Sequence, residues 1–238
     1  MKKAFYEFRD LLRTVPPFLV SLLILSIVGM NLLANKSIDT GLGWLALDCG
    51  IIFSWLVFLT MDITTHCYGP RAATLLSAAA LAVNLFMALM FFIASRIPGV
   101  WGESFTEGSE AVINTALDNS FGGTWYVILG SSIAFVCSAI INNFLNHGIG
   151  MLAKRKTGFG VFALRSYVST FIAQFADNLI FALIVSRNFF GWSLLQCFTC
   201  ALTGAVMELL FEVLFSPAGY RISKRIMAKR AKTEGAAA

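Results

Sequence analysis

The stretch LRSYVSTFIAQFADNLIFALI, residues 164–184, is long and apolar enough to cross a lipid bilayer. The hydrocarbon core of a membrane is about 30 Å thick, so a helix rising 1.5 Å per residue needs roughly 20 apolar residues to span it. The same stretch carries Gln174 and Asp177 near its middle. A charge at that depth costs at least about 2.5 kcal/mol, so such a residue usually faces the interior of a helix bundle and has a function.

Five further apolar stretches are similar to this one, in a chain of 238 residues that is 58% hydrophobic and 13% charged. This composition is far more apolar than that of a soluble domain. We therefore predict an all-α integral membrane protein with a single transmembrane domain over residues 1–238. Its six transmembrane helices are expected near residues 17–35, 41–61, 72–95, 123–146, 163–186 and 193–215, followed by a basic tail over 218–238. The first helix should be retained, because no small-residue cleavage site follows it.

Lys and Arg residues are distributed unequally among the connections between these helices. The two termini and the second and fourth connections hold fifteen of them, and the other connections hold three. Because cytoplasmic loops are enriched in Lys and Arg, both termini are expected in the cytoplasm. The net charge of +5 then belongs mainly to tails beside anionic lipid, so the lipid bilayer is the expected partner and nucleic acid is not.

Polar residues of the fifth predicted helix share one face. At 100° per residue, Ser166, Thr170, Gln174 and Asp177 lie within an arc of roughly 80°. Ser and Thr commonly do no more than hydrogen-bond a neighbouring helix, and we favour that interpretation for Ser166 and Thr170. Helix packing needs no charge, so Asp177 is predicted to bind a substrate together with Gln174.

The second predicted helix also carries acidic and aromatic residues on one face. Trp44, Asp48, Trp55 and Asp62 fall within about 40° of one another if this segment is one helix. Asp48 would lie roughly 10 Å from the outer end of its helix and Asp177 roughly 13 Å from the outer end of the fifth. Asp48 and Asp177 are therefore expected at one level of the bundle, with Asp62 nearer the cytoplasm.

A pocket of this composition suits a flat heterocycle. Carboxylates accept hydrogen bonds, an amide both donates and accepts them, and aromatic rings stack, which together match the Watson–Crick edge of a guanine. Trp55 and Phe181 are the rings expected to stack on it. A cation or a proton would also satisfy the carboxylates, so these residues alone leave the substrate open.

Two more acids lie in the sixth predicted helix, Glu208 and Glu212, one turn apart. Two like charges in an apolar helix repel, so at least one should be protonated or paired. They are the candidates for proton coupling.

Histidine and asparagine gather at the predicted cytoplasmic helix ends. Asp62 and His66 are one turn apart, and His147 follows the fourth predicted helix. A three-ligand metal site is the less favoured interpretation, and we expect His66 to form a helix-end hydrogen bond or a pH-sensitive gate. We expect no metal and no cofactor. The amides of Asn142, Asn143 and Asn146 are expected to cap the end of that helix.

Three segments resemble a known family. MDITTHCYGPRAA, residues 61–73, resembles the signature D-x3-E-x-[YF]-G, and RSYVSTFIAQFADNLIF, residues 165–181, resembles R-x3-S-x4-Q-x2-D-x3-F. NLLANK, residues 31–36, is similar to the end of the first helix of the same family. The family is that of the queuosine precursor transporters, also described as vitamin uptake transporters.

The resemblance implies import of 7-deazaguanines, such as queuine, preQ0 or preQ1, across the inner membrane of a bacterium. It also implies a fold similar to the six-helix substrate-binding subunits, or S-components, of energy-coupling-factor vitamin transporters. The chain departs from the signatures at His66, where the family commonly has Glu, and at Thr74, where a basic residue often stands. The site residues implied by the matching positions are Asp62, Tyr68, Gly69, Arg165, Ser169, Gln174 and Asp177.

Three classes of function can be weighed against the sequence. The chain has no G-x-S-x-G, no H-E-x-x-H and no Ser–His pair at matched depth, so an intramembrane enzyme is not expected. It has no G-x-x-x-x-G-K-[ST] loop either, which keeps open a substrate-binding subunit that needs a separate ATPase module. We predict a transporter for a small heterocycle, and the sequence leaves open whether it forms a homodimer.

Overall fold

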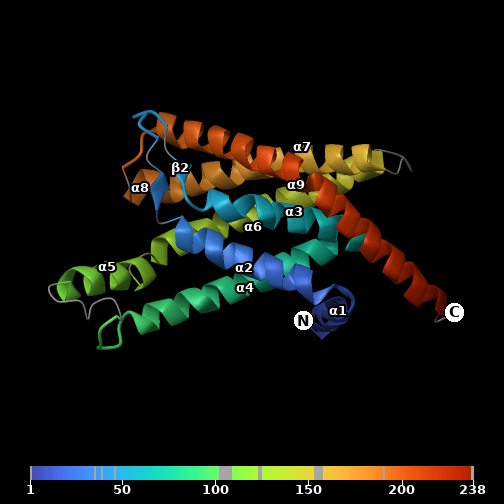
Figure 1. The fold of residues 1–238 in the computed structure, drawn as a ribbon, viewed down its shortest axis with the longest axis horizontal. Coiled ribbons are helices and arrows are strands. Elements are labelled where there is room, and N and C mark those ends of the chain that lie inside the picture. Colours follow the sequence, from blue (N-terminus) through green and yellow to red (C-terminus); the bar gives the residue numbers. More distant parts are fainter. Residues whose placement is uncertain are drawn as a thin grey trace.

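The computed structural model describes residues 2–34, 36–38, 40–45, 47–101, 109–122, 125–152, 158–189 and 191–236. Within these residues the chain is helical except for one short hairpin (Figure 1). The basic residues 154–156, which the orientation argument counts, lie outside the described residues. The elements are α1 Lys2–Thr14, α2 Pro17–Leu33, β1 Ser37–Ile38, β2 Leu47–Asp48, α3 Ile51–Tyr68, α4 Pro70–Ala94, α5 Glu110–Gly122, α6 Trp125–Leu152, α7 Phe159–Phe181, a π-helical turn Ala182–Ser186, α8 Arg187–Phe189 and α9 Leu194–Ala236.

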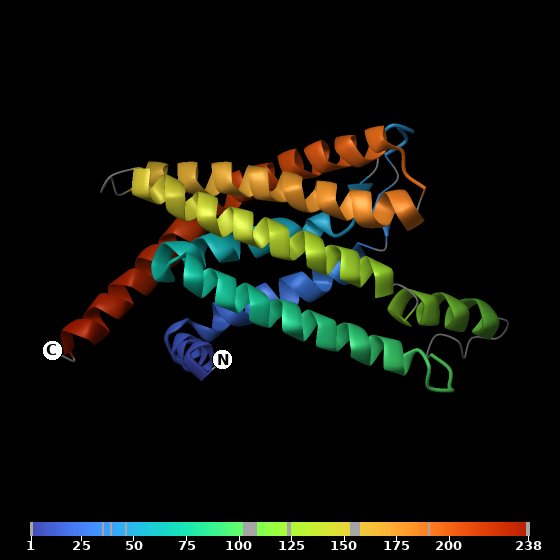
Figure 2. The same cartoon turned by 180° about the vertical axis from the view of Figure 1, so that it is seen from behind.

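The long helices run together along the long axis of the molecule as one bundle (Figures 1 and 2). Among the described residues, five helical segments are long and apolar enough to cross a membrane, and six if α1 and α2 count as one bent span. These two helices meet at 110°, so α1 lies across the end of α2. The predicted class, an all-α membrane protein, is confirmed.

Proline and glycine mark several helix boundaries. α2 begins at Pro17, directly after Pro16, where the missing N–H of proline costs no helical hydrogen bond. α3 ends at Tyr68 because Gly69 takes a backbone φ of 87°, a conformation that glycine adopts easily. Pro70 then opens α4, so a single residue turns the chain between two long helices.

The prediction of the second helix, residues 41–61, is wrong at its N-terminal end, because the observed helix begins ten residues later. The strands β1 and β2 form a hairpin in which Ser37 pairs with Asp48 and Ile38 with Leu47, and α3 begins only at Ile51. Gly41, with φ of 69°, forms the kind of turn that breaks a helix. Trp44 and Asp48 therefore do not share a helix face with Trp55 and Asp62.

Two other helices are longer than predicted. α6 runs to Leu152, so the asparagines expected to cap its end lie inside it. α9 is 43 residues long, which at 1.5 Å per residue is about 65 Å, twice the thickness of a bilayer core. Pro217 lies within α9, where proline removes a backbone hydrogen bond and bends the helix. Figure 1 shows the last part of α9 diverging from the bundle.

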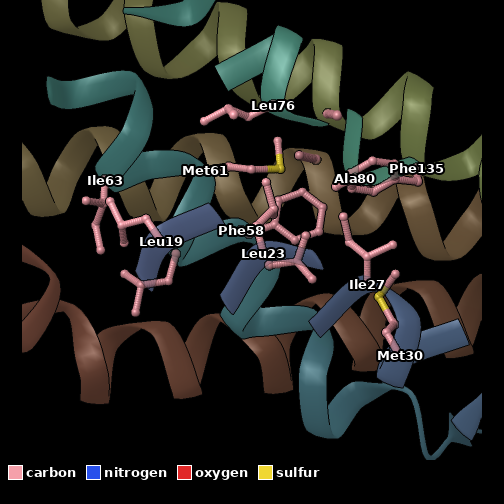
Figure 3. Close-up of a cluster of buried hydrophobic side chains, with 14 of the residues drawn as sticks. Leu19, Leu23, Ile27, Met30, Phe58, Met61, Ile63, Leu76, Ala80 and Phe135 are labelled. Carbon is pink, nitrogen blue, oxygen red and sulfur yellow. The ribbon is translucent and has the colours of Figure 1, made fainter. Parts of the chain in front are cut away.

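The apolar core lies between α2, α3, α4 and α6 (Figure 3). Phe58 of α3 is 0% exposed and stands near Leu23 and Met61, with Leu76 and Phe135 reaching the same cluster from α4 and α6. Large apolar side chains are also exposed on the outside of the bundle, as expected of helices that face lipid. They include Phe86, Phe144, Leu164, Leu210 and Leu214.

Removal of the Phe58 ring should affect stability far more than removal of a ring on the lipid-facing surface. Phe58→Ala removes a fully buried ring and leaves a cavity, so it should destabilise the protein by about 3–5 kcal/mol. Phe144→Ala removes a ring that is 68% exposed and should have a much smaller effect. Unfolding of both variants in one detergent or lipid would measure this, and equal losses would contradict the assignment of the core.

Candidate functional site

A small cavity lies where the hairpin approaches α3, α7 and α9. Its walls carry three acids, Asp48 from β2, Asp177 from α7 and Glu208 from α9. Phe181 adds an aromatic ring to the same walls. The cavity has a volume of about 40 Å³, enough for a few water molecules, since one water needs about 10–15 Å³ measured in this way.

Neutral hydrogen-bond donors hold the acids of the cavity. Asp48 Oδ1 accepts the backbone N–H of Gly50 at 2.7 Å, and Asp177 Oδ1 accepts the hydroxyl of Ser138 at 2.6 Å. Among the described residues, none of the three acids forms an ion pair with Lys or Arg. In the part of the chain that the structure describes, these acids therefore have hydroxyl, amide and backbone partners and no basic side chain as an ion-pair partner.

Glu208 is bound on both of its oxygens. The hydroxyl of Ser54, on α3, donates to Oε1, and the amide of Asn178, on α7, donates to Oε2 at 3.3 Å. Each oxygen of this carboxylate has a partner from a different helix.

The hairpin closes the cavity through contacts with the start of α9. The amide of Gln196 donates to the Gly43 carbonyl at 3.1 Å, and the Thr199 hydroxyl donates to the Trp44 carbonyl at 2.8 Å. The loop between β1 and β2 is thus fastened to the helix that carries Glu208.

A second acidic cluster lies farther along the same helices, around Asp62 of α3. Its Oδ1 accepts the amides of Asn142 and Asn146 on α6, at 3.0 and 2.8 Å. Its Oδ2 accepts the hydroxyl of Thr170 at 3.2 Å and that of Ser166, both on α7. Asp62 is completely buried, and these four donors replace the water it has lost.

Glu212 of α9 belongs to this second cluster. Its Oε1 contacts the Ser166 hydroxyl, which also contacts Asp62, and the two carboxyls are within hydrogen-bond reach of each other. Its Oε2 is buried and has no hydrogen-bond partner in the described part of the chain. The two glutamates of α9 thus reach two different clusters.

A network around Arg165 borders the second cluster. The guanidinium donates to Asn146, through Nε to its carbonyl at 3.1 Å and through Nη2 to its side-chain oxygen at 2.8 Å. Arg165 Nη1 lies 2.9 Å from Nδ1 of His66. Because a guanidinium can only donate, Nδ1 of His66 accepts, and its ring is neutral in this contact. Ser169 joins the network by donating to the Arg165 carbonyl at 2.7 Å.

Gln174 lies between the two clusters along α7. It is fully buried, and neither its side-chain oxygen nor its nitrogen has a hydrogen-bond partner among the described residues. It follows Thr170 by four residues and precedes Asp177 by three, so all three lie on one helix face. An unpartnered buried amide is costly, so this position is suited to a ligand or a bound water.

Trp55 does not line the cavity, contrary to the prediction. Its ring stacks on Phe215 and Phe211 of α9, with centroids 4.5 and 5.9 Å away, and its Nε1 donates to the Ile52 carbonyl at 2.8 Å. The later start of α3 removes the shared face on which the prediction depended. Phe181 is the aromatic ring that lines the cavity.

The predicted residues separate into two groups. The cavity contains Asp48, Asp177, Phe181 and Glu208, so Asp48 and Asp177 do meet, although Asp48 comes from a strand. Arg165 lies in the other group, because it is twelve positions from Asp177 on α7, about 18 Å. The second cluster and its border contain Asp62, His66, Arg165, Ser169 and Glu212.

Several residues of the site were not predicted from the sequence. Ser54, Ser138 and Asn178 bind the acids of the cavity, and a single polar residue on a helix does not signal such a role. The spacing of Asn142 and Asn146, one turn apart, could have indicated a shared polar face. The expected end of the helix at residue 146 led us instead to expect caps.

Acid–base behaviour at the cavity can be tested through Asp48, which precedes the first turn of α3. Burial raises the pKa of Asp48 to about 6, although the Gly50 N–H acts in the opposite direction. The unfolded chain, with a pKa near 3.9, loses this proton first as the pH rises, so wild-type protein should lose stability between about pH 4 and pH 6. Melting temperatures across that range should fall more steeply for wild type than for Asp48→Asn, because the other buried acids contribute to the fall in both proteins. Asp118→Asn, on α5, is the control, and identical profiles for wild type and Asp48→Asn would contradict the buried state.

Comparison with known proteins finds one family. Residues 48–222 match the family described as "Putative vitamin uptake transporter", and this range runs from β2 into α9 and includes both acidic clusters. Neither the curated proteins nor the solved structures contain a significant match. The chain therefore belongs to this vitamin uptake transporter family and is a multi-pass helical membrane protein of the transporter class.

Proposed function

We propose that the protein imports queuosine precursors of the 7-deazaguanine class, such as queuine, preQ0 or preQ1, across the inner membrane of a bacterium. The observation that carries the proposal is the convergence of Asp48, Asp177 and Glu208 on one cavity. A helix bundle in lipid does not need acids for packing, so their convergence favours a ligand rich in hydrogen-bond donors.

The ring of a 7-deazaguanine fits the chemistry of these walls. One edge of the ring presents adjacent N–H donors, and a carboxylate can accept two of them side by side. Asp177 is the best candidate for this acceptor, since it lines the cavity and its bound Oδ1 is oriented by Ser138. Gln174, one turn away, offers a donor and an acceptor, and Phe181 offers a stacking surface.

Entry of such a ring requires the cavity to open. A volume of about 40 Å³ accommodates water and is too small for a bicyclic heterocycle. The loop at Gly43 and Trp44 is fastened to α9 by two side-chain hydrogen bonds, which are easily exchanged for water. The hairpin lies at the end of the bundle opposite to both termini (Figure 1). We propose that the termini are cytoplasmic, as the Lys and Arg distribution predicts, so that the hairpin forms the outer gate and the Arg165–His66 contact belongs to the inner gate.

A second candidate function is that of a substrate-binding subunit that works with a separate ATPase module. The absence of a nucleotide-binding G-x-x-x-x-G-K-[ST] loop from the sequence favours it. Purified protein reconstituted alone in liposomes separates the two candidates. Uptake without ATP or a partner chain supports an autonomous transporter, and binding without uptake supports the subunit.

The decisive variant is Asp177→Asn. Charged hydrogen bonds contribute about 1.5–3 kcal/mol each. The substitution replaces one carboxylate oxygen, which accepts a hydrogen bond, with an NH2 group that would face an N–H of the ligand ring. The Kd for preQ1 or queuine should therefore rise roughly tenfold or more. Calorimetry or ligand-induced thermal stabilisation of purified protein would measure it.

Asp118→Asn serves as the matched control for Asp177→Asn. Asp118 accepts the indole N–H of Trp101 at 3.0 Å and does not line the cavity. This variant should bind the ligand as wild type does. Unchanged affinity in Asp177→Asn would move the binding site elsewhere, and weakened binding in both variants would point to a general loss of folding.

A further inference from the structure

We propose that Asp62 and Glu212 share a single proton, that Glu212 carries it, and that this proton holds α3, α7 and α9 together until the cavity opens. The proton site follows from the contacts of the second cluster alone. Its link to opening rests on the proposed transport function.

Proton counting at the shared contact requires one neutral carboxyl. The Ser166 hydroxyl has one proton, yet its oxygen contacts both Asp62 Oδ2 and Glu212 Oε1. The carboxyls also reach each other directly. Two ionised carboxylates in contact inside a buried site repel strongly, so such a pair holds a proton between its members.

The donors decide which member is ionised. Asp62 receives two amides and two hydroxyls, enough to occupy both oxygens of a carboxylate. Glu212 Oε2 is buried without a partner, although the Thr170 hydroxyl lies within reach of the Glu212 carboxyl as well as of Asp62. A charge on Glu212 would therefore be poorly solvated, and the proton belongs on this residue.

The surrounding charged groups do not remove the need for a proton on the Asp62–Glu212 pair. Arg165 of α7, a cation that borders this cluster, directs its donors to Asn146 and His66 rather than to either carboxyl. His66 of α3 accepts from that guanidinium. α6 presents only amides, and the remaining acid on α9 at this level, Glu208, belongs to the cavity. The pair thus has a net charge of −1 with the proton and −2 without it.

The two glutamates of α9 should consequently behave differently. Glu208 has a donor on each oxygen, from Ser54 and Asn178, so these contacts do not require it to carry a proton. Glu212 has no hydrogen-bond donor among the described residues that it does not share with Asp62. Although these residues are one turn apart on one helix, the contacts assign the exchangeable proton to Glu212.

Loss of this proton should loosen the helices that enclose the cavity. Asp62, Ser166 and Glu212 join α3, α7 and α9, and the same helices supply most of the cavity wall. Without the proton, two carboxylates compete for Ser166 in a site closed to water, which favours separation of the helices. Gln174, buried and unpartnered between the clusters, lies on the face that connects them. By linkage, opening of the cavity and release of the proton then favour each other.

Infrared spectroscopy of the purified protein in lipid tests the site without any substrate. At neutral pH the wild-type spectrum should contain the carbonyl stretch of a buried protonated carboxylic acid, which disappears reversibly as the pH rises. Glu212→Gln should lose that component, and Glu208→Gln should keep it. Ser166→Ala should shift its frequency, because it removes the acceptor of the Glu212 proton.

Thermal unfolding supplies a second measurement with the same variants. Wild type and Glu208→Gln should lose stability as the pH rises through the deprotonation step, whereas Glu212→Gln, a permanently neutral mimic, should not. A wild-type protein without the acid band, or one whose band and pH profile survive in Glu212→Gln, would overturn the proton site while leaving the transport proposal intact. If wild type shows the band and Glu212→Gln loses it, but wild type neither binds nor transports a 7-deazaguanine, the proton site stands and the proposed function is overturned.

Discussion

The burial of one carboxylate, Asp62, constrains the arrangement of most of the bundle. In lipid there is no bulk water to solvate a charge, so each of its lone pairs must find a protein donor. Asn142 and Asn146 supply these donors from α6, and Ser166 and Thr170 supply them from α7. A rotation of either helix would leave the charge unsolvated. The relative orientation of α3, α6 and α7 is therefore fixed by hydrogen bonding as well as by apolar packing.

α9 connects this constraint to the cavity. Glu208 and Glu212 are one turn apart on a stiff helix, yet the first joins the cavity with Asp48 and Asp177 and the second joins Asp62. Any movement of α9 that changes one contact changes the other, because a helix transmits displacement along its axis. The two acidic clusters are therefore mechanically linked through α9 and chemically linked through the polar face of α7 that carries Gln174.

The departure of this chain from the signature of the queuosine precursor transporters, which it resembles, has a local explanation. Where queuosine precursor transporters commonly carry Glu, His66 lies 2.9 Å from Arg165 and accepts a hydrogen bond from it. A glutamate there would form an ion pair with the same guanidinium. The neutral ring forms no ion pair with Arg165, whose guanidinium donates to Asn146 instead. The histidine thus changes the electrostatics of this end of the site more than its shape.

The sequence by itself determined the class of the protein. Apolar segments about 20 residues long have few folded states other than membrane-spanning helices, because their backbone groups must be satisfied within the segment. The position of Asp177 in such a segment marked it as a candidate site residue, because a charge in lipid is costly, and its proximity to Asp48 was expected.

Only the tertiary structure decided which polar groups meet. The pairing of Ser37 with Asp48 is not local, so no helical periodicity could show that α3 begins at Ile51. The partners of Glu208 and Glu212 were equally hidden, since residues one turn apart share a face in the sequence and the neighbouring helices determine what each one contacts. Buried hydrogen bonds between distant helices are a property of packing, and packing is where sequence periodicity ceases to be informative.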